Sequence, residues 1–241
     1  MRNLPQLLIG LVALALAVVV AAFVASSAVR DVKRARDTIT VTGSAKQPIT
    51  ADLIAWNLSV SAQDADPAFA SKTLKARAAQ VRAFLRDGGV TDAELSEPPV
   101  STEQVDVTLP DKTRSSEYRL TQSFDVTSRA IDRVQGLAAR VTDLLGRGVP
   151  VSAQPLQYVS TQLTQARLAA LQRATHDART RAETIVHGIG GHLGGARKAE
   201  LGVYQVTPRN STDVSDYGIN DTSSREKDVT AVVTVTFGLS S

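Results

Sequence analysis

Histidine is the first residue type to test for chemistry, because the chain has three histidines and no cysteine. His187 and His192 are five positions apart, whereas two metal ligands on one helix face need a spacing of three or four. His176 and Asp177 are neighbours on an expected helix, and neighbouring helical positions do not face each other. We interpret these residues as parts of a helix and of the turn after it. The sequence therefore predicts no metal site, no cofactor and no catalytic histidine pair.

A glycine-rich stretch at residues 188–195 and a small acidic patch are the next candidates. The glycines follow a helix rather than a strand, so they lack the context of a phosphate-binding loop. We interpret them as a helix C-cap and a flexible turn. Asp92, Glu94 and Glu97 could supply a carboxylate pair for acid–base chemistry. We interpret them as a solvated loop, so no catalytic residue is predicted.

The densest polar stretch, residues 220–227, is the candidate contact site. Loops carry function more often than core elements do, and this one offers Asn220, Asp221, Arg225 and Lys227 to a partner. The alternative is an ordered turn that leads into the last strand. Sequence alone leaves both interpretations open.

Charge is distributed unevenly along the chain. The first 37 residues hold five of the 27 basic residues and two of the 24 acidic ones, so residues 38–241 carry 22 of each. A nucleic-acid-binding domain carries its own basic excess. We therefore expect no nucleic-acid partner, although the whole chain has a net charge of +3.

Residues 7–28 form an uncharged, largely apolar run. At 1.5 Å per residue the run makes about 33 Å of helix, enough to cross a bilayer core of about 30 Å. A cleaved signal peptide is the alternative, but its apolar region is usually only about 7–15 residues long. We expect residues 1–37 to form a single-pass transmembrane anchor, or a signal, with a basic flank. Residues 38–241 would form the main domain.

Alternating apolar and polar residues predict strands, and apolar residues at helical spacing predict helices. The expected strands cover residues 38–42, 52–61, 98–109, 118–126, 149–160, 201–206 and 228–239. The expected helices cover residues 67–87, about 129–145 and 162–189. The last helix should bury a stripe of mostly small residues: Leu171, Ala174, Ala178, Ala182, Ile185 and Ile189. The order β-β-α-β-β-α-β-α-β-β predicts an α+β fold.

Several segments of the chain, in their order, resemble the SIMPL-domain family, a domain of unknown function. The resemblance rests on residues 39–43, 50–58, the helix before Gly88, residues 95–104 and residues 229–237. It implies a mixed, largely antiparallel sheet with helices packed on it, in a domain outside the cytoplasmic membrane. It also implies that some relatives form ring-like or hollow oligomers. It implies no established catalytic residues, so none are carried over to this chain.

The resemblance and the charges disagree about membrane orientation. Arg30, Lys33, Arg34 and Arg36 follow the apolar run, and the positive-inside rule would keep that side in the cytoplasm. Long domains translocate largely regardless of charge, so we follow the resemblance. We expect a protein of the inner membrane with a periplasmic main domain.

We expect a non-enzymatic oligomeric scaffold or binding module of the cell envelope. The membrane, through residues 7–28, and further copies of the chain are the expected partners. The alternative is a small-ligand or hydrolytic enzyme whose Asp, Glu, Tyr and Arg residues are dispersed in the sequence. A pocket with convergent polar groups would favour that alternative.

Overall fold

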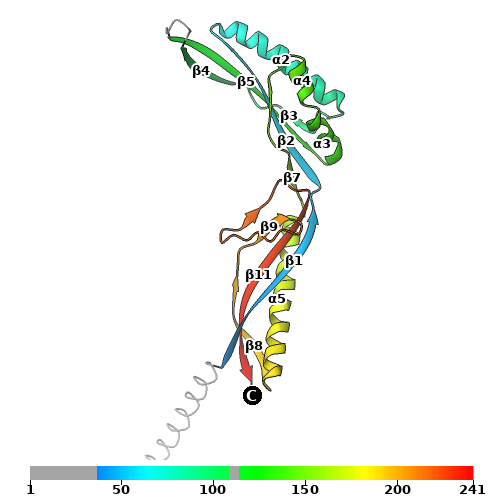
Figure 1. Cartoon of the computed structure of the whole chain (residues 1–241), viewed down its shortest axis with the longest axis vertical. Coiled ribbons are helices and arrows are strands. Elements are labelled where there is room, and N and C mark those ends of the chain that lie inside the picture. The colour runs from blue at the N-terminus through cyan, green and yellow to red at the C-terminus, as the bar shows by residue number, and fades with distance from the viewer. Residues whose placement is uncertain (1–36, 109–113, 241) are drawn as a thin grey trace, which may run out of the picture. The chain divides into compact units, whose positions relative to one another are not determined.

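Figure 1 shows the computed structural model, which describes residues 37–108 and 114–240. The segment expected to span the membrane, residues 7–28, lies outside the described residues. None of the helices that are described is both long and apolar enough to cross a membrane. The chain forms two compact units, which we call unit 1 and unit 2. Of the described residues, unit 1 comprises 37–46, 168–204 and 230–240, and unit 2 comprises 47–108, 114–167 and 205–229.

Unit 1 is a short antiparallel sheet with one long helix against it. It contains most of strands β1 (Thr38–Thr50) and β11 (Glu226–Ser240), the whole of β8 (His192–Leu201) and most of helix α5 (Leu163–Gly188). β11 pairs with β1 and, antiparallel, with β8. On one face of the sheet, the Thr40 and Thr42 hydroxyls are 2.8 and 3.0 Å from the hydroxyls of Thr236 and Thr234. The opposite face carries the apolar positions of the strands.

Helix α5 packs on unit 1 through alanine rather than through large side chains. Ala170, Ala174, Ala178 and Ala182 are fully buried. A Cβ atom added at Gly43 of β1 would lie 2.2 Å from the Ala174 carbonyl oxygen. The helix backbone therefore approaches the strand backbone closely, and only glycine fits at that position.

The buried stripe of α5 lies partly elsewhere than predicted. Ala174, Ala178 and Ala182 are buried as expected, but Ile185 is 48% exposed and Ile189 is 73% exposed. The buried series continues instead through Val186. Close backbone approach selects the face with small side chains, and the larger apolar residues are left on the neighbouring faces.

Unit 2 is a larger, layered α+β structure. Its sheet contains β2 (Leu53–Asp64), β3 (Leu95–Ser96), β4 (Ser101–Thr108), β5 (Arg114–Ser128), β6 (Val151–Ala153) and β7 (Gln157–Val159). All the pairings given for this sheet are antiparallel. The helices α2 (Pro67–Asp87), α3 (Ile131–Ala139) and α4 (Thr142–Gly146) contribute side chains to the core on one face. The parallel strand pair β9 (Gln205–Pro208) and β10 (Ile219–Asn220) completes the unit.

The core of unit 2 is built from large side chains. Leu58 and Phe124 lie opposite each other on β2 and β5, and both are fully buried. Leu85 of α2 and Leu137 of α3 join the same cluster. Alternating polar residues on these strands face away from the helices, which explains the period of two that the sequence shows.

The helix α2 confirms its prediction at both ends. The carboxylate of Asp66 accepts a hydrogen bond of 2.8 Å from the Ala68 N–H, and Pro67 is the first helical residue. An Asp cap followed by Pro satisfies a free amide and fixes the helical φ angle. Gly88 follows the last helical residue, as expected.

Five of the predicted features are wrong in detail. The expected strand at 201–206 is interrupted, because β8 ends at Leu201 and β9 begins at Gln205. The expected single sheet is two sheets, and the expected helix at 129–145 is split into α3 and α4. Arg140 and Val141 bond to carbonyls three residues back, which tightens and ends α3. The expected strand at 149–160 is interrupted between β6 and β7 around Pro155, which has no amide to donate. Gly194 lies in strand β8 and not in a turn, and a Cβ there would come within 2.8 Å of the Gly238 carbonyl oxygen.

Candidate functional site

The predicted contact residues lie on the segment between β10 and β11, within unit 2. Asn220 is the last residue of β10 and is exposed. Arg225 is also exposed and forms a 2.6 Å ion pair with Asp132 of α3. Lys227 is only 3% exposed. The four residues therefore divide into two that reach solvent and two, Asp221 and Lys227, that are directed inward.

Asp221 and Lys227 hold this segment in a fixed turn. The Lys227 ammonium donates to the carbonyl oxygen of Tyr158 at 2.8 Å and to the carbonyl oxygen of Asp221. The Asp221 carboxylate accepts from the Ser223 N–H at 2.9 Å and the Ser224 N–H at 3.2 Å. Asp221 and Lys227 thus belong to an ordered turn. A contact role for Asn220 and Arg225 stays a prediction.

The surroundings shift the pKa values of both inward-directed groups. Burial lowers the pKa of Lys227, against the opposing effect of the Asp221 carboxylate. Burial alone would raise the pKa of Asp221, but hydrogen bonds from Ser223 and the charge of Lys227 bring it below its usual value. An ionised carboxylate beside a buried ammonium stabilises the turn, since neither group is free to act on a ligand.

The acidic patch predicted at residues 92–97 is tied up in ion pairs. Glu94 accepts hydrogen bonds from Arg133 at 2.6 and 2.7 Å and from the Ser128 hydroxyl at 2.5 Å. Burial would raise the pKa of Glu94, but the bonds from Ser128, Thr91 and Arg133 prevail and lower it to about 2. A general acid needs a pKa near the working pH, so Glu94 serves to hold the loop against α3.

The other two members of the patch also have basic partners. Glu97 accepts two hydrogen bonds from Arg82 of α2, at 2.7 and 2.6 Å. Asp92 pairs with Arg86 at 2.9 Å, with both side chains largely exposed. The patch is therefore a set of salt bridges, two to α2 and one to α3, and not a pair of free carboxylates.

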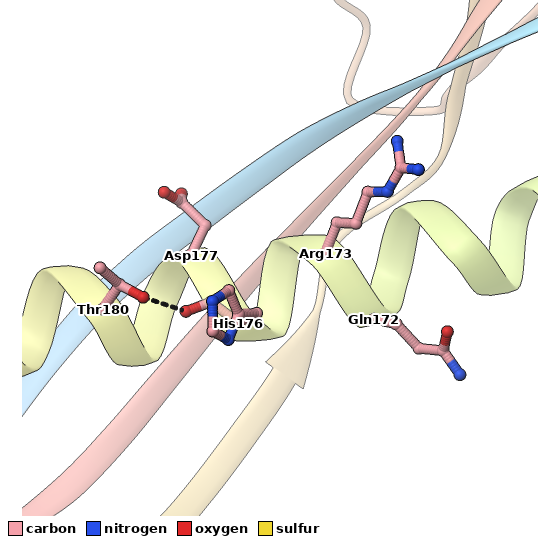
Figure 2. A pocket seen from close by; sticks show the side chains of 5 residues that line it. All are labelled: Gln172, Arg173, His176, Asp177 and Thr180. Atoms are coloured by element: carbon pink, nitrogen blue, oxygen red, sulfur yellow. Dashed lines mark hydrogen bonds between the residues drawn. The ribbon is translucent and has the colours of Figure 1, made fainter.

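A shallow hollow on α5 contains the histidine and the acid that were tested as a catalytic pair. Figure 2 shows its lining residues, which all come from one helix: Gln172, Arg173, His176, Asp177 and Thr180. The Asp177 carboxylate accepts from the Ser44 N–H at 2.9 Å and from Arg181 Nε at 2.8 Å. Its pKa is lowered, first by the bond from Ser44 and then by the bond from Arg181. Asp177 therefore fastens α5 to β1.

A second hollow lies on the polar face of the unit 2 sheet. Asn57 Nδ2 donates to Asp125 Oδ1 at 2.6 Å there, and Thr127, Gln154 and Gln157 also line the site. Its lining contains no basic residue. Among residues 37–108 and 114–240, no three His, Cys, Asp or Glu side chains gather in a way that could hold a metal ion.

Two exposed apolar residues outside the predicted contact stretch lie in the loop between β9 and β10. Val214 is 79% exposed and Tyr217 is 98% exposed. No helix or strand is predicted between residues 206 and 228, and only residues 220–227 are singled out there. Two large apolar side chains within such a stretch are the signal that could have separated this part from the turn at Asp221.

Comparisons with known proteins show the family. The family model described as "SIMPL: Protein of unknown function (DUF541)" matches residues 39–237. No curated protein matches the chain. Among solved structures, the ligand-free regulatory subunit of aspartate kinase from Thermus thermophilus is 14% identical, with 82% of this chain and 88% of that chain covered and a TM-score of 0.21. A similarity of that size carries no argument about fold or function. Because the family model spans most of the chain, this protein belongs to the SIMPL family of proteins of unknown function.

Proposed function

We propose that this protein is a non-enzymatic component of the cell envelope. Residues 7–28 anchor it in the cytoplasmic membrane, and the main domain lies outside the cytoplasm. There it acts as an oligomeric scaffold or binding module.

The observation that carries the non-enzymatic part of the proposal is that protein groups hold the carboxylates: Glu94 accepts from Arg133 and Ser128, and Asp221 accepts from Ser223 and Ser224. In the part of the chain that the structure describes, every carboxylate with a shifted pKa is shifted downwards: Asp52, Glu94, Glu97, Asp177 and Asp221. Each of them accepts hydrogen bonds from neighbouring protein groups. Such groups stay ionised at neutral pH and reinforce the fold, whereas acid–base catalysis needs pKa values moved towards neutrality.

Charge and sequence supply further support. The 22 basic and 22 acidic residues of 38–241 balance, which disfavours a nucleic-acid partner. The apolar run at residues 7–28 has the length of a membrane span and exceeds that of a usual signal peptide.

Reporter fusions to the C-terminus of the full chain test the location. Alkaline phosphatase folds actively outside the cytoplasm, and a green fluorescent protein exported in the unfolded state stays dark there. We expect an active phosphatase fusion and a dark fluorescent fusion, both in the membrane fraction. A bright fluorescent fusion with inactive phosphatase would place the domain in the cytoplasm, as Arg30, Lys33, Arg34 and Arg36 suggest. A matched chain lacking residues 1–36 serves as the cytoplasmic control.

A further inference from the structure

The loop at residues 210–218 presents two apolar side chains to solvent. Tyr217, at 98%, and Val214, at 79%, are the most exposed large hydrophobic residues in the described part of the chain. They lie three positions apart, so both can contribute to one contact. Tyrosine is enriched at the energetic centres of interfaces because it supplies a large contact area at low entropy cost.

Hydrogen bonds hold the backbone of this loop in place. The buried Gln205 donates its Nε2 to the Ser215 carbonyl oxygen at 2.6 Å, and the Gly218 N–H donates to the same oxygen at 3.1 Å. The Asp213 N–H donates to the Ser211 hydroxyl at 3.0 Å, and that hydroxyl donates to the Asp213 carboxylate at 2.8 Å. A loop that is already ordered loses little conformational freedom on binding.

The charge of the loop restricts what it binds. Residues 210–218 contain Asp213 and Asp216 and no Lys or Arg. Asp216 has no partner among the described residues and is exposed. An anionic lipid surface would repel these carboxylates. The fitting partner is therefore a protein surface that combines exposed apolar side chains with a basic group.

Strand β8 and the residues after it form such a surface. β8 pairs with β11 alone among the described strands, which leaves its other edge unpaired. Leu201 is 53% exposed and Val203 is 44% exposed. Arg197 falls at an irregularity in the β8–β11 register, is exposed, and has no acidic partner in residues 37–108 or 114–240.

We propose that Val214 and Tyr217 of one copy dock on Leu201 and Val203 of a second copy, with Asp216 beside Arg197. The two surfaces differ, so the contact is reciprocal if two copies form a two-fold dimer and head-to-tail if more copies form a ring or filament. This inference rests on the proposed oligomeric function and names the surface that forms the oligomer.

Charge reversal in the full chain, purified in detergent, tests the contact by light-scattering mass. Asp216→Arg and Arg197→Glu should each reduce assembly, raising the concentration that it requires by about tenfold or more. The doubly substituted chain should assemble as the wild type does. An equimolar mixture of the two single variants should also assemble, because every contact between alternating copies then joins opposite charges. Leu168→Ser, at another exposed apolar position, is the matched control and should leave the mass unchanged.

The possible outcomes distinguish this specific contact from the more general proposal that the protein is oligomeric. Recovery in the mixture supports a contact between copies and shows that both single variants are folded. If the wild type is oligomeric and neither single variant changes its mass, this contact is wrong and the proposed function stands. Single variants that remain monomeric after mixing overturn the pairing of Asp216 with Arg197. A monomeric wild type overturns both the inference and the oligomeric function.

Discussion

Units 1 and 2 both pack helices on a sheet, but small side chains form the contact in unit 1 and large side chains form it in unit 2. In unit 1, the Ala174 and Ala178 backbones of α5 approach Gly43 of β1 so closely that no Cβ fits. In unit 2, Phe124 and Leu58 fill the space between the sheet and its helices. The stability of unit 1 should therefore fall when atoms are added at the helix–strand contact, and that of unit 2 when atoms are removed from its core. Substitutions in opposite directions therefore test each unit.

Phe124→Ala in unit 2 should have the largest effect. Removal of a fully buried aromatic ring leaves a cavity and costs about 3–5 kcal/mol of unfolding free energy. Denaturant unfolding followed by the fluorescence of Trp56, the sole tryptophan and a member of the same core, measures it. Phe69→Ala, on the exposed side of α2, is the control and should change stability by less than about 0.5 kcal/mol. Equal effects of the two substitutions would contradict the described core.

Gly43→Ala in unit 1 should be the next largest. The added methyl group would meet the Ala174 carbonyl oxygen and the Ala178 amide nitrogen at 2.2 and 2.4 Å, so α5 must shift. Overpacking of this kind costs about 1–3 kcal/mol, measured by thermal unfolding with circular dichroism. Gly136→Ala in α3, where no atom lies within 4 Å of the new Cβ, should instead stabilise by about 0.5–1 kcal/mol. If Gly43→Ala left the stability unchanged, α5 and β1 would have to lie farther apart than described.

Glu94→Gln in unit 2 should cost about 1–3 kcal/mol at pH 7, because Arg133 and Ser128 lose a charged acceptor. The Glu94 pKa falls from 4.5 to about 2 on folding. Its contribution is therefore complete above pH 4.5 and is lost as the pH falls towards 2. Urea unfolding from pH 7 to pH 2 should show a steeper loss in the wild type than in the variant. Parallel pH curves would refute the role of Glu94.

Asp177→Asn in unit 1 should have the smallest effect of the four. Asp177 also has a lowered pKa and ties α5 to Ser44, but its bonds lie at the surface and are screened by solvent. We expect a smaller change in thermal midpoint than for Glu94→Gln, in the same direction. Melting curves of both variants at two salt concentrations check this, and a larger loss for Asp177→Asn would reverse the contrast.

Local sequence signals predicted much of the fold. The cap at Asp66, the alternation along residues 52–61 and the last strand all depend on neighbouring residues, and the structure confirms them. The stripe of α5 could be predicted only in part, because the choice between alanine and isoleucine faces depends on Gly43, which is distant in sequence. Hydropathy alone favours burial of the isoleucines, whereas the close approach of the α5 and β1 backbones favours burial of the alanines.

The candidate site was harder to predict for the same reason. Lys227 is polar, and its burial depends on the carbonyl oxygen of Tyr158, 69 positions away. Glu94 has the sequence context of a solvated acid until Arg133, 39 positions away, is placed beside it. Local sequence does not reveal such long-range partners, and it therefore could not separate the inward-directed Asp221 and Lys227 from the exposed Asn220 and Arg225.

The mass of the full wild-type chain in detergent tests the central claim, that this protein works by presenting surfaces to other copies of itself. Light scattering over a range of concentrations measures it. The account predicts a mass that is a multiple of the 25.6 kDa chain and falls towards one chain on dilution. A mass of one chain at every concentration would contradict it.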